Sequence, residues 1–139
     1  MKKSIRCFGI LFVFFIVITS LYGCGRKIYS LEGDWEFAST FLGEQELTKE
    51  MLEAGNEDPP TLKCTKNEFT LIYFDTCITG TWESTGDDQY SFFLKDGFKV
   101  YSATLKADGN KKQMLTLKHS DEMKKEIDDS NNFTMVFER

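Results

Sequence analysis

Short runs of alternating apolar and polar residues, separated by turn-forming residues, dominate the second half of the chain. A period of two is typical of strands that bury one face of a sheet. Six such runs follow one another, at 61–66, 69–74, 77–84, 89–95, 98–106 and 113–118. The Asn, Asp and Gly residues between them favour tight turns, and loops this short join only antiparallel neighbours. The sequence therefore predicts an antiparallel sheet.

The two ends of the domain supply one further strand each. Trp35, Phe37 and Phe41 alternate with polar residues near the start, and 133–139 alternates in the same way at the end. Eight strands in an open sheet would leave two unpaired edges and a bare apolar face, whereas closure hides both. We therefore predict an all-β fold, an up-and-down antiparallel eight-stranded barrel. One short helix is expected after the first strand, because 44–54 is rich in helix formers and is followed by a glycine and two prolines.

The alternation also predicts which side chains point into the barrel. The expected inward set is Trp35, Phe37, Phe41, Phe69, Leu71, Tyr73, Ile78, Gly80, Trp82, Tyr90, Phe92, Leu94, Leu115, Leu117, Phe133, Met135 and Phe137. A bulge is expected at 98–106, where the apolar residues change parity, and a short helix is expected at 123–127. In a closed barrel the first and last strands are neighbours, so Trp35 and Arg139 should meet as a cation–π pair.

The first 24 residues have the pattern of an export signal. Lys2, Lys3 and Arg6 precede an apolar stretch that ends in Leu-Tyr-Gly-Cys at 21–24. The segment resembles the bacterial lipoprotein signal, in which the chain is cut before the cysteine and the cysteine carries the lipid. We therefore assign 1–23 to a signal peptide, 24–31 to a tether lipidated at Cys24, and 32–139 to the barrel domain. The expected location is the extracytoplasmic face of the cell membrane, through the lipid anchor.

The charge of the chain limits its partners. The formal charge is −5, and loss of three signal-peptide cations changes it to −8 for the 116 residues from Cys24 onward. An acidic domain whose cations lie among acids is a poor partner for nucleic acid or for an anionic membrane surface. Contact with the membrane is therefore expected through the lipid anchor only. A chain of this length suits one domain, which we expect to be monomeric.

Two cysteines, Cys64 and Cys77, remain for the folded domain. In an exported protein they could form a disulfide, stay as two free thiols or, with His119 as the single histidine, contribute to a metal site. Two-residue loops at 67–68 and 75–76 would place the two cysteines on opposite faces of the sheet, which opposes a disulfide. A bulge or a longer turn would remove that conflict, so the alternatives stay open.

Several short motifs carry a resemblance to a known family. Gly33-Asp34-Trp35 on the first strand, with Arg139 closing the last, resembles the Gly-x-Trp opening and terminal Arg of lipocalins and other calycins. The order of three further motifs, Gly-Thr-Trp at 80–82, Leu-Thr-Leu at 115–117 and Met-Val-Phe-Glu-Arg at 135–139, is similar to that in small lipocalin-like lipoproteins of Gram-positive bacteria. This resemblance implies a fold and a cell-envelope location, with no settled ligand. META-type lipoproteins are the competing family and fit the Trp35 and Arg139 ends less well.

No residue pattern in the chain indicates catalysis, a cofactor or a metal. His-Ser-Asp at 119–121 has the residue types of a hydrolase triad, but sequence neighbours cannot adopt its relay geometry. The leading hypothesis is therefore a non-enzymatic barrel that binds a small apolar or amphiphilic ligand in its mouth. The residues expected to line that mouth are Tyr73, Trp82, Tyr90 and Phe92. The alternative is a structural or protein-interaction lipoprotein of the envelope with a filled barrel, whose outer patch would include Phe93 and Tyr101.

Overall fold

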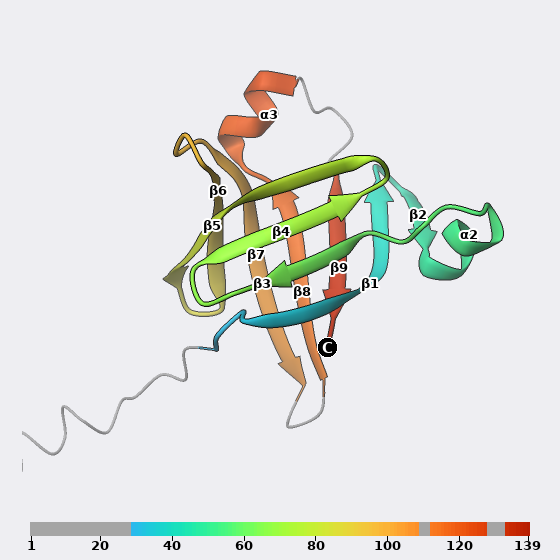
Figure 1. Ribbon diagram of the computed structural model, residues 1–139, viewed down its shortest axis with the longest axis horizontal. Helices are drawn as coiled ribbons and strands as arrows, with labels where there is room; N and C mark the ends of the chain where they lie inside the picture. Colours follow the sequence, from blue (N-terminus) through green and yellow to red (C-terminus); the bar gives the residue numbers. More distant parts are fainter. Residues whose placement is uncertain (1–28, 109–111, 128–132) are drawn as a thin grey trace, which may run out of the picture.

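Eight antiparallel strands close into a barrel within the part of the chain that the computed structural model describes, residues 29–108, 112–127 and 133–139 (Figure 1). The barrel strands are β1 (Gly33–Leu42), β3 (Thr61–Cys64), β4 (Glu68–Tyr73), β5 (Thr76–Gly86), β6 (Gln89–Leu94), β7 (Lys99–Asp108), β8 (Lys112–His119) and β9 (Thr134–Glu138). Each strand pairs with the next, and β1 also pairs with β9, so the sheet has no open edge there. The predicted closed barrel is confirmed. The predicted signal peptide and Cys24 lie outside the described residues.

The segment between β1 and β3 differs from the prediction. Its first part is a short strand, β2 (Gln45–Thr48), which forms a hairpin with 39–42 of β1, and helix α2 (Lys49–Ala54) begins only after it. The helix predicted directly after the first strand is therefore wrong in position and too long. Gly43, at φ +66°, forms the hairpin turn, and the hydroxyl oxygen of Thr48 caps the helix by accepting a hydrogen bond from the Met51 amide.

A second helix, α3 (Asp121–Ile127), follows β8 and contacts β7 and β8. It is the short helix that the sequence predicted around 123–127. It lies over one end of these strands (Figure 1). The described part of the chain thus contains the two short helices that the sequence predicted, the first of them displaced and shortened. Neither has the length and apolar character that crossing a bilayer requires.

The interior of the barrel is filled by side chains from every barrel strand. The apolar residues that are at most 4 % exposed are Leu31, Trp35, Phe37, Leu62, Cys64, Phe69, Leu71, Tyr90, Phe92, Val100, Tyr101, Ala103, Leu105, Leu115, Leu117, Met135 and Phe137. Most of the predicted inward set is confirmed by this list. The predicted residues Tyr73, Ile78, Trp82, Leu94 and Phe133 are half-buried and pack against this core. Phe41 is half-buried on the other face, because β1 shifts register between Phe37 and Ser39, so that Phe41 pairs with Thr134. A core of this kind supplies the main favourable free energy of folding.

The bulge predicted in 98–106 is present in β7. Phe92 pairs with Tyr101 while the next residue, Phe93, pairs with Lys99, so Val100 is the extra residue. Val100 and Tyr101 are both buried as a result. The expectation that Tyr101 forms part of an exposed outer patch is therefore wrong.

The packed domain begins earlier than residue 32. Leu31, which the sequence placed in the tether, is fully buried, and Tyr29 packs against the core. The packed domain therefore includes Tyr29 and Leu31, which the sequence assigned to the tether.

Candidate functional site

Arg139 and Trp35 meet at one end of the barrel, as predicted. The Arg139 guanidinium carbon lies 4.1 Å from the centroid of the Trp35 ring. The guanidinium also donates hydrogen bonds to the carbonyls of Ser30 (2.7 Å) and Glu32 (2.6 Å). Gly33 adopts φ +134°, and a Cβ at this position would lie 3.1 Å from an Arg139 nitrogen. The glycine of the Gly-x-Trp motif therefore makes room for the arginine that covers the tryptophan.

Two of the predicted ligand-lining residues close this same end. The Tyr90 hydroxyl donates a 2.6 Å hydrogen bond to the carbonyl of Tyr29, and Trp82 lies edge-on against Tyr90 with ring centroids 5.9 Å apart. Trp82 Nε1 donates to the carbonyl of Thr65 in the β3–β4 turn. Burial raises the pKa of the Tyr90 phenol, and Asp88 raises it further. Both side chains thus act as structural contacts.

The other two predicted ligand-lining residues lie elsewhere. Phe92 is fully buried inside the barrel, edge-on against Phe69 at 4.9 Å. Tyr73 is the last residue of β4, at the opposite end from Trp35, and its ring lies edge-on against Phe74. The four residues therefore do not form one mouth pocket. The alternation of apolar and polar residues predicted which face of the sheet each side chain occupies. It did not predict the position of the side chain along the barrel axis.

The His-Ser-Asp run at 119–121 serves packing and helix capping. The His119 ring stacks between Tyr101 and Phe133, at 5.7 and 4.7 Å. Ser120 donates to the Lys99 carbonyl and accepts from the Met123 amide, at the start of α3. Burial raises the pKa of the Tyr101 phenol in this stack. The run closes the second end of the barrel.

Cys64 and Cys77 are both free thiols. Cys64 pairs with Phe69 and Cys77 pairs with Ile72, three residues further along β4, so the cysteines are on opposite faces. Cys64 points into the core and Cys77 is exposed. The disulfide considered from the sequence is therefore not formed, and the two cysteines lie on opposite faces of the sheet as the two-residue loops predicted.

The two thiols are expected to differ sharply in reactivity. Burial raises the pKa of Cys64 to about 12, only partly offset by the Arg139 charge. Because the thiolate is the reactive form, a maleimide at pH 8 should modify Cys77 in the folded protein and Cys64 only after unfolding. At about pH 9.5 Cys64 should still be unmodified in the folded protein, since its thiol stays protonated there. Peptide mapping by mass spectrometry measures both sites, and equal modification in the folded state would place Cys64 outside the core.

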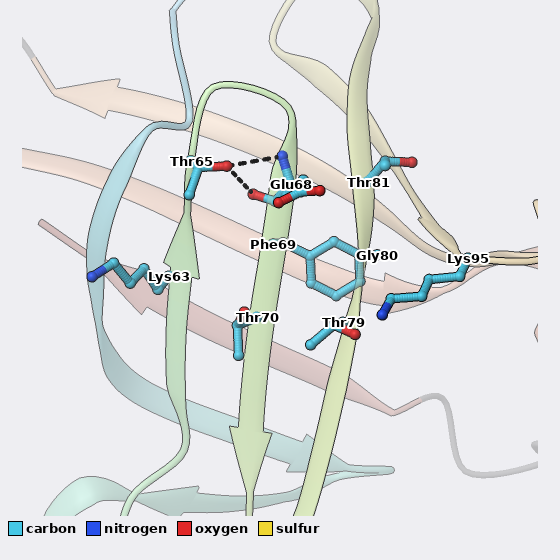
Figure 2. Close-up of a pocket in the computed structure, with 9 residues that line it drawn as sticks. All are labelled: Lys63, Thr65, Glu68, Phe69, Thr70, Thr79, Gly80, Thr81 and Lys95. Carbon is cyan, nitrogen blue, oxygen red and sulfur yellow. Dashed lines mark hydrogen bonds between the residues drawn. The ribbon is translucent and has the colours of Figure 1, made fainter.

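An open groove of about 280 Å³ lies on the outer surface of β3, β4 and β5 (Figure 2). It is lined by Lys63, Thr65, Glu68, Phe69, Thr70, Thr79, Gly80, Thr81 and Lys95. Figure 2 shows Lys63 and Lys95 on opposite sides of the groove, with Thr70 and Thr79 between them. The sequence did not predict this groove, although the outward threonines alternate with the core residues of β4 and β5. Its polar lining can bind by hydrogen bonds but contains no nucleophile and base held together.

The turn between β4 and β5 carries an unusual aromatic residue. Phe74 is 54 % exposed and adopts φ +49°, a left-handed conformation that costs free energy for a bulky side chain. Ile72 beside it is 46 % exposed, and Cys77 pairs with Ile72 on the same outer face. We call Ile72, Phe74 and Cys77 the β4–β5 tip. The sequence placed 69–74 in a strand and therefore did not identify this exposed tip.

No three His, Cys, Asp or Glu side chains gather into a possible metal site among the residues that the structure describes. No model of a known protein family matches the chain, and no curated protein matches it. The fold thus defines a class by geometry alone. That class is the closed, eight-stranded antiparallel barrel with a packed interior and capped ends.

Proposed function

We propose that this protein is a lipid-anchored, lipocalin-like lipoprotein on the extracytoplasmic face of the cell membrane, which binds an envelope protein through the outside of its barrel. The lipobox pattern ending in Cys24 supports the anchor. The Gly33, Trp35 and Arg139 arrangement is compatible with a lipocalin-like fold. The observation that carries the function is the strained, exposed Phe74 on a barrel whose interior is already filled.

The packed interior favours an outer binding surface over a ligand in the mouth. Ligand pockets usually need about 300 Å³ or more of enclosed, largely apolar space. The side chains expected to line such a pocket are instead in contact with one another or at opposite ends, and Phe92 is fully buried. A small apolar ligand is the second candidate, and it would require core side chains to move outward.

The β4–β5 tip offers what a protein partner needs. Aromatic residues carry a large share of binding free energy when a partner covers them. Ile72 and Phe74 place apolar area in solvent, and the left-handed backbone at Phe74 disfavours a bulky side chain such as phenylalanine. The free energy stored in this turn is consistent with a residue retained for binding rather than for folding.

A photo-crosslinking amino acid at position 74 tests this proposal in intact cells. It should give one discrete adduct with an envelope protein, whereas the same amino acid in place of the exposed Thr104, on β7, should give none. Phe74→Asn supplies the matched variant, because asparagine tolerates the left-handed turn and removes the ring. It should keep or slightly raise the Tm and lose co-purification of the partner. Absence of an adduct at position 74, together with an apolar molecule retained in native mass spectrometry, would favour the mouth site instead.

A further inference from the structure

The start of the described chain is fixed to one end of the barrel. The carbonyls of Tyr29, Ser30, Leu31 and Glu32 each accept a hydrogen bond, from Tyr90, Arg139, Trp35 and Arg139 respectively, at 2.6 to 2.8 Å. Leu31 is fully buried among these contacts. This segment therefore cannot lengthen the tether without breaking the end of the barrel.

Only 25–28 separate Cys24 from this fixed segment. Five residue steps reach at most about 18 Å even when fully extended. The 10-residue strands β1 and β7 are longer than that, at roughly 33 Å each. If Cys24 is lipidated, as proposed above, the Arg139 end of the barrel must therefore lie close to the bilayer surface.

The base of the β7–β8 hairpin lies beside the same end. Arg139 Nε donates to Gln113 Oε1 at 2.6 Å, and the backbone amides of Arg139 and Gln113 each donate to the other's carbonyl. In Figure 1 this hairpin extends beyond the other strands near the C-terminus, on the side where β1 begins. The outer face of this hairpin therefore reaches the end of the barrel that holds the start of the described chain.

That outer face has a composition suited to lipid headgroups. A hollow of about 380 Å³ is lined there by Lys106, Ala107, Lys112, Gln113, Met114 and Glu138. Met114 is 42 % exposed, and Lys112 forms a 2.9 Å ion pair with Glu138. An apolar side chain flanked by lysines can place its carbon and sulfur atoms at the level of the headgroups while the lysines contact phosphates. We call Lys106, Lys112 and Met114 the Met114 face.

We propose that the Met114 face rests on the phospholipid surface and that the β4–β5 tip points away from the membrane. This orientation rests on lipidation of Cys24. The lipid tether, rather than charge attraction, keeps this face on the bilayer, because an acidic domain gains little from an anionic surface. The contact should therefore be insensitive to salt. The tip is then presented to proteins of the envelope rather than to lipid.

Fluorescence quenching in vesicles tests the orientation with the full lipidated chain. The vesicles contain phosphatidylcholine, phosphatidylglycerol and a lipid with a nitroxide at the headgroup. One sample carries a fluorophore on the native Cys77, and the matched sample carries it on Met114→Cys in a Cys77→Ser background. We expect the nitroxide to quench the fluorophore at position 114 and not the fluorophore at position 77. High salt should not change either result.

The outcomes separate this proposal from the one on which it rests. Partition into the detergent phase reports whether the chain carries lipid, and the Cys24→Ser variant is the negative control. A lipidated chain with equal quenching at both positions, or quenching at 77 alone, overturns the orientation only. A chain that stays in the aqueous phase overturns the anchor and the orientation together. Lys106→Cys is the second probe if Met114→Cys does not fold, and the same pattern is expected there.

Discussion

Gly80→Ala should destabilise the barrel by about 3 kcal/mol or more, because the added methyl group has no space. A Cβ at Gly80 would lie 1.8 Å from the carbonyl oxygen of Phe93 and 2.8 Å from its carbonyl carbon. Both are backbone atoms of the neighbouring strand β6, so they can move only if the β5–β6 pairing breaks. A lowering of Tm by roughly 10 to 20 °C, measured by circular dichroism, is the expected result.

Gly55→Ala is the matched control for this substitution. The nearest atoms to a Cβ at Gly55 are the carbonyl oxygens of Leu52 and Met51, at the ordinary distances of 3.4 and 3.6 Å. Its φ of −84° suits alanine, so the change in unfolding free energy should stay within about 0.5 kcal/mol. If Gly80→Ala were as stable as Gly55→Ala, the close approach of β5 and β6 would be disproved.

Arg139→Ala should lower the free energy of unfolding by about 2 to 4 kcal/mol. The substitution removes the cation–π contact with Trp35, roughly 1 kcal/mol at a partly exposed site, and hydrogen bonds to Ser30, Glu32 and Gln113. It also frees the segment that holds Leu31 in the core. Urea unfolding measures the loss, and faster amide hydrogen exchange near Leu31 should accompany it.

Two variants control for the charge of Arg139. Arg139→Lys keeps the cation but cannot donate to three acceptors in the same geometry, so it should recover only part of the loss. Lys63→Ala removes an exposed cation whose pair with Asp34 spans 3.9 Å, and it should change stability by no more than about 0.5 kcal/mol. If Lys63→Ala lowered the free energy of unfolding as much as Arg139→Ala does, the effect of Arg139→Ala would come from net charge rather than from its contacts.

The strands were predicted correctly where the pattern of neighbouring residues alone determines which side chains are buried. Residues such as Leu115, Leu117, Met135 and Phe137 alternate with polar neighbours, and a pleated strand turns that alternation directly into a buried face. The bulge at Val100 was predicted for the same reason, since a change of parity has few other causes.

The prediction failed where two local patterns competed. Residues 45–48 have the composition of a helix, yet they form β2, because the turn at Gly43 brings them alongside Phe41 and Leu42 of β1. Backbone pairing with an existing strand then outweighs helix propensity, which is a weak preference over so few residues.

The sequence by itself determined the strand order, the closure of the barrel and the meeting of Trp35 with Arg139, since these follow from a period of two and from chain ends that must pair. Only the tertiary structure decided that the interior is filled, that Trp82 and Tyr90 cap the Arg139 end, and that Phe74 is exposed. The physical reason is that parity assigns a side chain to a face, whereas its height in the barrel and the space left around it depend on the tilt and packing of all eight strands.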